Sequence, residues 1–384
     1  MKILHVMSCR GWSSDAYWAA RICRELARRG HEVTLACRAG TEARVIDRAR
    51  LEGVERVETL ALASGVAPAA DVGDVHRLAG WLRTADVVHV HRGKEHWLAA
   101  LANRVAGTRR PLLRTRHIAQ AVGAHAGNRW LYGRATALVV AVTEAIRRQY
   151  LAAGLLAPDR VVTLAGGADA EAFAPRAADP AMRARLGGRD GALLVGMIGG
   201  LRVMKGHRVV IEAAARLGDA WPLRFVFVGQ GAHEAAVRGM VSRAGLDDRV
   251  TLAGFVDDLP AAMAALDVAL YVPMESDGMS RVVWEYLAAG LPLIAARVGA
   301  AAESLADGEH ALLVHAGDAA DLGRALARLA ADAALRRRLG AGGRALLLER
   351  HSGARLAAAL EERYARLADV GAPGALLGNA RPGS

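Results

Sequence analysis

The sequence predicts an α/β protein built from two successive parallel-sheet domains. Short runs of β-branched residues alternate with longer helical patterns along most of the chain, which is typical of βαβ units. At 173–191, two prolines and a cluster of glycines interrupt both periodicities. A strand, a glycine-containing loop and a helix then begin again near residue 193. A length of 384 residues agrees with two domains of roughly 150 residues or a little more.

The individual elements follow from these patterns. In the first half the strands are expected at 2–7, 32–37, 54–60, 87–90, 112–116, 138–142 and 161–164. In the second half they are expected at 193–198, 225–228, 250–252, 268–271, 293–295 and 311–314, with helices from 318 to about 369. Ligands of such sheets bind beyond the carboxyl ends of the strands, at helix N-termini. Two such domains facing each other would form a cleft.

Composition excludes several classes of protein. Hydrophobic residues make up 53% and charged residues 23% of the chain, as in a folded globular protein. No apolar run reaches the ~18 residues needed to span a bilayer, and the apolar start is too short for a signal peptide, so we expect a cytoplasmic protein. Cys9, Cys23 and Cys37 are each 14 residues apart. That spacing fits no zinc motif, and we interpret them as apolar fillers.

The charge is unevenly distributed. The net charge is +11, of which residues 1–180 carry +9 and residues 181–384 carry +2. A basic half can indicate nucleic acid, an anionic membrane surface or phosphorylated substrates. Aromatic residues make up only 4% and are not interleaved with basic clusters, which argues against nucleic acid.

The loop 199–207 has the features of a phosphate site. It lies between a predicted strand and a predicted helix, where glycines allow close backbone approach and the helix start presents unpaired N–H groups. Arg202 and Lys205 add formal charge. The loop is neither a P-loop nor a dinucleotide fingerprint. Only three of the 50 basic residues are lysines, so a lysine here suggests a point-charge contact to phosphate; the alternative is an ordinary solvated lysine at a helix start.

A second constellation spans 273–292. Ser280 is a plausible N-cap, and Gly290 with Pro292 ends the predicted helix. Asp277 then lies in the loop and Glu285 about one and a half turns into the helix. Both carboxylates can face one cleft and accept hydrogen bonds from vicinal hydroxyls. The alternative for either residue alone is a solvated surface position.

In this order along the chain, the motifs resemble those of glycosyltransferase family 4, which comprises retaining enzymes of the GT-B fold that use sugar nucleotides. The resemblance runs from residue 1 to about 364. Its landmarks are Gly30-His31-Glu32-Val33, Asp86 to His91, Thr115-Arg116-His117, Val142-Thr143-Glu144, Gly167-Ala168-Asp169 with Phe173, Lys205-Gly206-His207, Asp277 to Glu285, Arg297-Val298-Gly299 with Glu303, and Asp307-Gly308.

The resemblance implies roles for the donor-side residues. Lys205, with a nearby arginine, would neutralise the donor diphosphate, and Glu285 would bind the ribose hydroxyls. Asp277 would bind the hydroxyls of the donor sugar. The sugar would also meet the backbone amides of Gly278, Met279 and Ser280.

The resemblance also implies roles elsewhere. His117, from the N-terminal domain, would approach the donor sugar, and Gly11 would lie close to donor and acceptor. The stretch that ends at Val256 would border the base. No metal and no cofactor are implied beyond the sugar nucleotide, which is a co-substrate. We interpret most of the 13 histidines, including His89 and His91, as structural.

Four positions depart from the family pattern. The first acidic position is Asp277 instead of glutamate, the third motif glycine is Ser280, the usual arginine falls on Gly200, and the usual asparagine before Gly167 is Gly166. Arg202 lies three residues before Lys205 and could replace the missing guanidinium.

The resemblance gives two GT-B domains facing across a cleft. We expect an N-terminal acceptor-side domain at 1–172, a linker at 173–191 and a donor-binding domain at 192–351. A helix at 352–370 would pack back on the N-terminal domain, and 371–384 would be a flexible tail.

The acceptor is expected to be a glycan or glycolipid in lipopolysaccharide or envelope polysaccharide synthesis. The basic residues Arg109, Arg110, Arg114 and Arg116, with Arg129 and Arg134, could contact an anionic membrane peripherally; the alternative is ordinary solubility charge. Two other functions stay open at this stage. One is another GT-B enzyme, a phosphorylase or sugar-nucleotide epimerase, and the other is a non-catalytic protein that binds sugar nucleotides.

Overall fold

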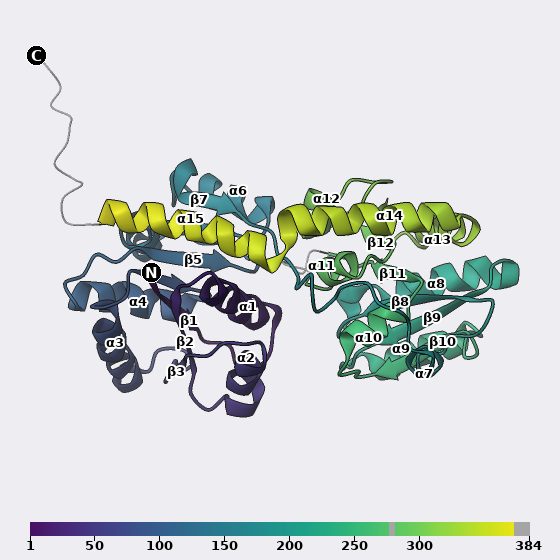
Figure 1. Cartoon of the computed structure of the whole chain (residues 1–384), viewed down its shortest axis with the longest axis horizontal. Helices are drawn as coiled ribbons and strands as arrows, with labels where there is room; N and C mark the ends of the chain where they lie inside the picture. Colours follow the sequence, from purple (N-terminus) through teal and green to yellow (C-terminus); the bar gives the residue numbers. More distant parts are fainter. Residues whose placement is uncertain (276–280, 372–384) are drawn as a thin grey trace, which may run out of the picture. The chain divides into compact units, whose positions relative to one another are not determined.

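The computed structural model describes residues 1–275 and 281–371 (Figure 1). The chain forms two compact units. Unit 1 comprises Met1–Leu164 and the described part of Gly353–Ser384, and unit 2 comprises Ala165–Ser352. Each unit has one sheet, and all the strand pairs described in these sheets are parallel.

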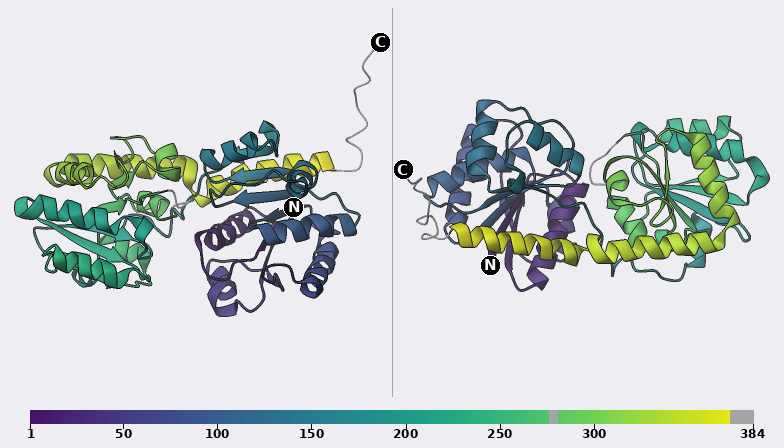
Figure 2. Two further views of the ribbon diagram at one scale, coloured as in Figure 1. Left: turned by 180° about the vertical axis from the view of Figure 1, so that it is seen from behind. Right: turned by 90° about the horizontal axis from the view of Figure 1, so that it is seen from above.

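The sheet of unit 1 has the strand order β3-β2-β1-β4-β5-β6-β7. Its strands are β1 (Lys2–Met7), β2 (Glu32–Arg38), β3 (Val57–Leu60), β4 (Val87–Val90), β5 (Leu112–Arg116), β6 (Leu138–Ala141) and β7 (Val161–Thr163). Every residue of β4 and β6 is buried, because helices cover both faces of this sheet (Figure 2).

The helices of unit 1 are α1 (Ser14–Arg28), α2 (Asp47–Leu51), α3 (Pro68–Leu82), α4 (Gly93–Val105), α5 (Ala126–Trp130), α6 (Glu144–Ala152) and α15 (Gly353–Gly371), with short turns η1 (Glu42–Ile46), η2 (Leu131–Ala135) and η3 (Pro158–Arg160). Helix α1 packs against α2 and α15, and α3 packs against α4. Glu361 of α15 accepts a hydrogen bond at 3.0 Å from the ring of His31 and pairs with Arg29. The last helix of the chain is thus part of the first unit.

The sheet of unit 2 has the strand order β10-β9-β8-β11-β12-β13. Its strands are β8 (Leu193–Ile198), β9 (Leu223–Val228), β10 (Val250–Gly254), β11 (Val268–Tyr271), β12 (Leu293–Ala296) and β13 (Leu312–Val314). Its helices are α7 (Pro180–Arg185), α8 (His207–Leu217), α9 (Glu234–Arg243), α10 (Leu259–Ala264), α11 (Arg281–Ala288), α12 (Gly299–Ser304), α13 (Ala319–Ala331) and α14 (Ala333–Leu346), with turns η4 (Val203–Lys205), η5 (Gly218–Ala220) and η6 (Leu347–His351).

Two hydrophobic cores stabilise unit 2, one on each face of the sheet. Val209 of α8, Val237 of α9 and Leu326 of α13 belong to one core, and Met263 of α10 and Trp284 of α11 belong to the other. The crossover from β8 to β9 and the crossover from β11 to β12 run in opposite directions along the sheet. Because such crossovers are right-handed, their helices lie on opposite faces.

Residues 173–191 differ from the linker that the sequence predicts. Phe173 is buried in a core of unit 2. Arg183 of α7 donates a hydrogen bond at 2.7 Å to the carbonyl of Ala265 and pairs with Asp267 at 2.8 Å. The prolines and glycines interrupt the helical and strand periods, but the side chains between them still pack, so this segment is part of unit 2.

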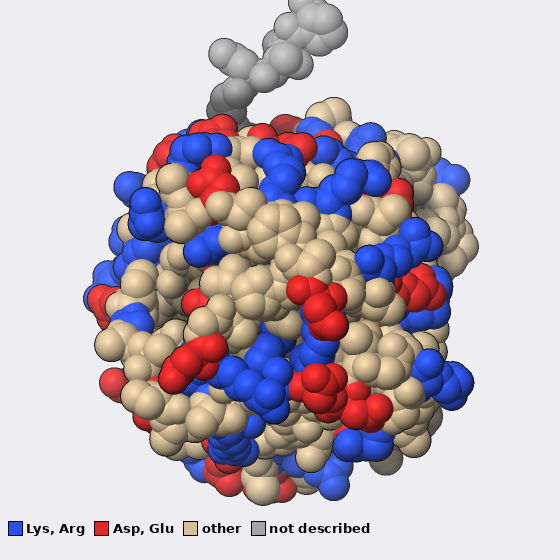
Figure 3. Space-filling model, turned by 90° about the vertical axis from the view of Figure 1, so that its right-hand side faces the viewer, with Lys and Arg blue, Asp and Glu red and all other residues tan. Residues whose placement is uncertain are grey.

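Two surface properties bear on the expectations above. Within the described residues, no helix is long and apolar enough to cross a membrane. Figure 3 shows a face on which basic and acidic side chains are interspersed, so this face is not a surface of one sign of charge.

Candidate functional site

Each sheet has a point where its strand order reverses, between β1 and β4 in unit 1 and between β8 and β11 in unit 2. In open α/β sheets, ligands bind outside the carboxyl ends of the strands at this switch point. The loops that follow β1 and β4 are therefore the candidate site of unit 1, and the loops that follow β8 and β11 are the candidate site of unit 2. In unit 2 they are the loops predicted to bind phosphate and sugar.

The loops after β8 and β11 contact each other directly. The Met274 N–H donates a hydrogen bond at 2.8 Å to the carbonyl of Met204. A Cβ on Gly206 would lie 1.9 Å from the carbonyl oxygen of Val272, and Gly206 has a φ of +85°. Only glycine fits this position. The loop 199–207, which we name the lysine loop, is thus held against the segment that leads to Asp277.

A second contact joins the lysine loop to the loop after β9. A Cβ on Gly229 would lie 2.1 Å from the carbonyl oxygen of Gly199, and one on Gly231 would lie 2.2 Å from that of Leu201. Gly200, in contrast, has space for a Cβ, since its nearest neighbour would be the carbonyl oxygen of Gln230 at 3.6 Å. Gly229 and Gly231 thus allow close backbone packing between these two loops.

Arg202 and Lys205 lie in the loop between β8 and α8. Arg202 is exposed and precedes the turn η4, and Lys205 is the half-buried last residue of that turn. Helix α8 begins two residues after Lys205, so its positive N-terminal end adds to these two charges. The buried ring of His207 packs edge-on against Phe227 at 5.0 Å between centroids, and burial lowers the pKa of this ring to about 4.

Glu285 is a buried carboxylate on α11. It is 1% exposed, and its Oε1 lies 3.0 Å from Nε of Arg281, one turn earlier on the helix. The next residue, Tyr286, accepts a hydrogen bond at 2.7 Å from the backbone N–H of Ile198, which fixes α11 against the end of β8. Burial raises the pKa of the Tyr286 phenol, so its hydroxyl is neutral.

Asp277, Gly278, Met279 and Ser280 lie outside the described residues, so their predicted contacts to the donor sugar stay predictions. Val256, which was predicted to border the base, is 3% exposed and lies in a core of unit 2. Its neighbour Phe255 is 54% exposed, which leaves the Phe255 ring available to stack on a ligand.

In unit 1, the first turn of α1 and the loop after β4 meet through an ion pair. Nε of Arg92 lies 2.6 Å from Oδ2 of Asp15. Burial acts to raise the pKa of Asp15. The hydrogen bond from Arg92, the electrostatic interaction with His117, the hydrogen bond from Ser13 and the charge of Arg92 outweigh burial and hold the pKa below its usual range. Glu95 of α4 accepts hydrogen bonds from the backbone N–H groups of Ser8 at 3.1 Å and Arg92 at 2.8 Å.

Gly11 lies in the loop between β1 and α1. A Cβ built on it meets nothing within 4 Å. Packing within the chain therefore gives no reason for glycine at this position, whereas a ligand that approaches the backbone closely would.

His117 follows the last residue of β5 and is 7% exposed. Its Nε2 lies 3.3 Å from Nδ1 of His91, and its ring packs edge-on against Trp18 at 5.5 Å. Burial lowers the pKa of His117 to about 4, so the ring is neutral near pH 7. Among the described residues, its Nδ1 has no hydrogen-bond partner.

The sequence analysis did not single out several residues that the structure places at the switch-point loops of the two units. Arg281 could have been found from its spacing of four residues before Glu285. Asp15 and Arg92 are 77 residues apart, and only the sheet order brings them together. His89 and His91, interpreted as structural histidines, lie in one buried cluster with His117: the rings of His89 and His91 stack, and His91 contacts His117. Their period of two in a strand, which puts both on one face, was the available signal.

One basic residue does not fit the expected membrane surface. Arg114 is 4% exposed and donates hydrogen bonds at 2.9 Å to His96 and to Tyr132. It therefore cannot contribute to a surface that attracts anionic headgroups. Arg109, Arg129 and Arg134 are exposed.

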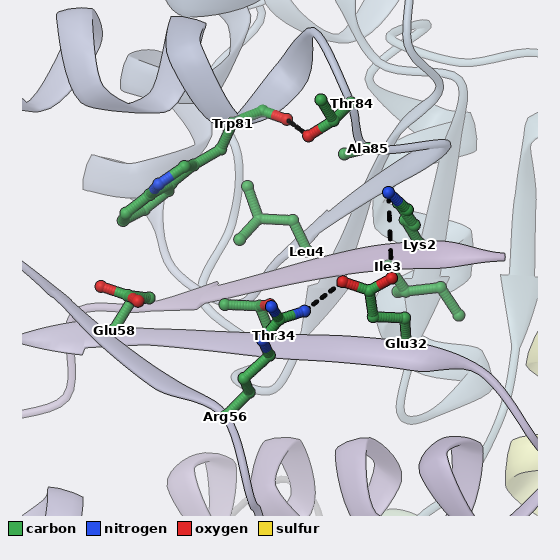
Figure 4. A pocket seen from close by; sticks show the side chains of 10 residues that line it. All are labelled: Lys2, Ile3, Leu4, Glu32, Thr34, Arg56, Glu58, Trp81, Thr84 and Ala85. Carbon is green, nitrogen blue, oxygen red and sulfur yellow. Dashed lines mark hydrogen bonds and ion pairs between the residues drawn. The ribbon is translucent and has the colours of Figure 1, made fainter.

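A separate cavity of about 190 Å³ lies in unit 1 at the amino-terminal ends of the strands, opposite the ends that carry the candidate site (Figure 4). Lys2 and Glu32, which line it, begin β1 and β2 and lie 3.9 Å apart. Glu32 also pairs with Arg56. Because the cavity opens at the amino ends of the strands and its charges are already paired, it is not the site that the fold favours.

Comparison with known proteins identifies the family. Residues 16–172 match the model described as Glycosyltransferase Family 4, and residues 192–332 match the model described as Glycosyl transferases group 1. The Bacillus subtilis protein EpsD is 30% identical over 299 residues, which cover 74% of this chain and 77% of EpsD. The chain belongs to glycosyltransferase family 4.

Two further relatives of the family 4 chain match over shorter regions. The D-inositol 3-phosphate glycosyltransferase of Stackebrandtia nassauensis is 35% identical over 199 residues, which cover 48% of this chain and 44% of that protein. The lipopolysaccharide core biosynthesis glycosyltransferase LpsE of Rhizobium meliloti is 31% identical over 170 residues, which cover 44% of this chain and 49% of LpsE. The chain thus spans about half the length of these curated relatives.

Solved structures show the fold of this family 4 chain. Anabaena HepE, solved in complex with UDP, matches with a TM-score of 0.81 at 20% identity, covering 95% of this chain and all of HepE. A glycosyltransferase from Rickettsia africae matches with a TM-score of 0.82 at 17% identity, covering 95% of this chain and 98% of that protein. The two Rossmann-like parallel-sheet units are those of the GT-B fold.

Proposed function

We propose that this family 4 chain is a retaining glycosyltransferase. It moves a sugar from a nucleoside-diphosphate sugar to a hydroxyl of a glycan or glycolipid, in lipopolysaccharide or envelope polysaccharide synthesis. The observation that carries the proposal is the contact between the loops after β8 and β11 at the switch point of unit 2. This contact holds Lys205 beside the segment that leads to the helix of Glu285.

The charges of unit 2 suit a departing nucleoside diphosphate. Cleavage of the donor concentrates negative charge on the distal phosphate, and one cation at ~4 Å in an effective dielectric of ~20 contributes about 4 kcal/mol before desolvation. Lys205 and Arg202 would each act in this way, and the N-terminus of α8 would add backbone N–H groups. The buried carboxylate of Glu285 would accept hydrogen bonds from ribose hydroxyls.

The relatives support the donor class and the pathway. HepE was solved with UDP, and LpsE is a glycosyltransferase of lipopolysaccharide core biosynthesis. The acceptor would bind to unit 1, near Gly11 and the Asp15–Arg92 pair. Exposed Arg109, Arg129 and Arg134 would favour a peripheral contact with an anionic membrane on its cytoplasmic face.

The decisive experiment incubates the purified full chain with a panel of nucleoside-diphosphate sugars and extracted glycolipids, and identifies the products by mass spectrometry. We expect transfer from one donor with the anomeric configuration retained. Inversion would contradict the retaining mechanism. Nucleotide binding without turnover on any acceptor would favour a binding protein, and interconversion of the sugar nucleotide itself would favour an epimerase.

The proposed reaction needs no metal, because two cationic side chains and a helix end supply the positive charge. We expect EDTA to leave the transfer rate unchanged. A loss of rate that Mg²⁺ restores would show instead that a cation shares the diphosphate with Lys205.

A further inference from the structure

Six buried side chains of unit 1 form one continuous series of hydrogen bonds, which we name the histidine chain. It lies between the sheet and the helices α1 and α15, and all six residues are at most 7% exposed. In order of contact, its members are Thr115, His89, Tyr364, His5, His91 and His117.

The contacts follow one another without a gap. His89 Nε2 lies 2.7 Å from Thr115 Oγ1, and His89 Nδ1 lies 2.5 Å from the hydroxyl of Tyr364. That hydroxyl lies 3.4 Å from His5 Nε2. His5 Nδ1 lies 3.1 Å from His91 Nε2, and His91 Nδ1 lies 3.3 Å from His117 Nε2. Each ring up to His91 thus uses both of its nitrogens.

The four rings are neutral near pH 7. Burial lowers the pKa of His5 to about 3 and that of His117 to about 4, and burial lowers the pKa of His89 and of His91 well below the usual value. A neutral imidazole has one nitrogen that donates and one that accepts. The proton position on one ring therefore fixes the proton position on the next ring.

Tyr364 sets the direction of the series. The distance of 2.5 Å to His89 Nδ1 suits an O–H donor, which makes shorter hydrogen bonds than an N–H donor. With the phenolic proton directed at His89, the phenolic oxygen can only accept from His5, at the longer distance of 3.4 Å. His89 then donates from Nε2 to Thr115.

The remaining protons follow by elimination. His5 carries its proton on Nε2, so its Nδ1 accepts from Nε2–H of His91. The Nδ1 of His91 in turn accepts from Nε2–H of His117. His117 is left with a lone pair on Nδ1, the one nitrogen of the series that has no partner among the described residues.

The carboxylate of Asp15 does not change this assignment. Asp15 interacts electrostatically with His117, but its Oδ2 already accepts from Nε of Arg92 at 2.6 Å, and its Oδ1 accepts from the hydroxyl of Ser13. Both oxygens of this carboxylate thus accept from donors other than His117. Arg92, Arg114 and Arg116 also act on His117 and oppose a positive charge on its ring.

A second buried histidine of unit 1 provides a contrast. Arg114 donates to Nδ1 of His96 at 2.9 Å, and Nε2 of His96 lies 2.7 Å from Thr136 Oγ1. Thr136 in turn donates to the carbonyl of Leu131 at 2.7 Å. Both nitrogens of His96 are occupied and its proton is fixed on Nε2, as expected for a purely structural histidine.

We propose that the histidine chain holds His117 as the Nε2–H tautomer, so that its buried and unpartnered Nδ1 keeps a lone pair that can accept a hydrogen bond from a hydroxyl of the bound ligand. Tyr364, His5 and His91 are positioning residues that act through His117. That the hydroxyl belongs to a sugar rests on the proposed function. The tautomer itself does not depend on it.

The test is the tautomeric state of His117 in the full-length protein. Two-bond ¹H–¹⁵N correlation spectra of the ¹⁵N-histidine-labelled chain distinguish a protonated from an unprotonated ring nitrogen, and a His117→Gln variant identifies the signals of His117. We expect Nδ1 to be unprotonated and Nε2 to be protonated. A protonated Nδ1, or an imidazolium ring near pH 7, would overturn the proposal.

Tyr364→Phe removes the directing hydroxyl and keeps the ring. We expect the His117 signals to move toward a mixture of both tautomers and kcat to fall roughly tenfold, by analogy with the loss of the outer hydrogen-bond partner of a metal-bound histidine. Tyr150→Phe is the matched control, since Tyr150 is also fully buried in unit 1 and its hydroxyl bonds only to Tyr132 at 3.2 Å among the described contacts. An unchanged His117 spectrum in Tyr364→Phe would refute the role of Tyr364.

The spectra also separate this inference from the proposed function. If the chain transfers no sugar but His117 carries its proton on Nε2, the proposed function fails and the histidine chain stands. If transfer occurs and Nδ1 is protonated, the proposed function stands and the assignment of the histidine chain fails.

Discussion

Lys205 is the residue on which the donor-phosphate proposal depends most directly. It ends the turn η4, half-buried, with α8 beginning two residues later. We predict that Lys205→Ala lowers kcat by about 10² to 10³, the usual cost of removing one group that stabilises developing charge. Steady-state kinetics with the identified donor measures this.

Arg208→Ala is the control for that measurement. Arg208 lies on the first turn of α8 and pairs with Glu212 at 2.5 Å, so the variant removes a cation close to Lys205 without touching the loop. If both variants lose activity equally, or if Lys205→Ala turns over like the unmodified chain, the phosphate role of Lys205 is wrong.

His117 offers a second prediction at the residue scale. His117→Ala should lower the transfer rate while the affinity for the free nucleoside diphosphate stays unchanged, because the nucleotide would bind to unit 2 and His117 belongs to unit 1. Isothermal titration with UDP and steady-state rates measure the two effects. Equal losses of both would indicate that His117 supports the fold alone.

At the scale of elements, glycines at the two switch points have opposite physical roles. A Cβ on Gly206 would lie 1.9 Å from a backbone oxygen at a φ of +85°, while a Cβ on Gly11 would meet no atom within 4 Å. We predict that Gly206→Ala destabilises the chain by about 1 to 3 kcal/mol or more. Gly11→Ala should leave the urea midpoint unchanged and lower activity.

Urea unfolding and transfer rates of the two variants check this pair of predictions. A stable, fully active Gly11→Ala would mean that no ligand approaches this backbone. A Gly206→Ala as stable as the unmodified chain would mean that the loops after β8 and β11 separate at little cost, which would weaken the main support for the proposed function.

The order of elements could be predicted from the sequence because it depends on local periodicity. The strands at 2–7, 87–90, 112–116, 193–198 and 268–271 were predicted with the bounds that the structure has. The lysine loop, its helix and the position of Glu285 followed from the same patterns. Element ends were less certain, as for the strand predicted at 54–60, which begins at Val57.

The contacts between elements could not be predicted, because they depend on which loops the sheet order brings together. The Asp15–Arg92 pair and the histidine chain join residues far apart in sequence, in one case 359 positions. Composition led to a wrong prediction at two places in the chain. Prolines and glycines at 173–191 indicated a linker although Phe173 and Arg183 pack into unit 2, and the charge of Arg114 indicated surface although its guanidinium is buried.

At the scale of the whole molecule, both units bury neutral histidines. Burial lowers the pKa of His5 to about 3 and that of His117 to about 4 in unit 1, and the pKa of His207 and of His351 to about 4 in unit 2. In the unfolded chain these rings titrate near 6.5. Between these values the unfolded state binds more protons than the folded state, so the free energy of unfolding increases with pH.

The resulting prediction concerns acid stability. The contribution of these rings is fully present above pH 6.5. It is lost as the pH falls toward their folded pKa values, about 3 for His5 and about 4 for the other three, at about 1.4 kcal/mol per pH unit for each ring. Asp15, whose pKa is lowered in the folded chain, acts in the same direction at lower pH. The urea midpoint should therefore fall steadily from about pH 7 to about pH 5. A midpoint that stays constant or increases over this range would mean that the buried rings are already charged, and a charged His117 could not present the lone pair that the histidine chain assigns to it.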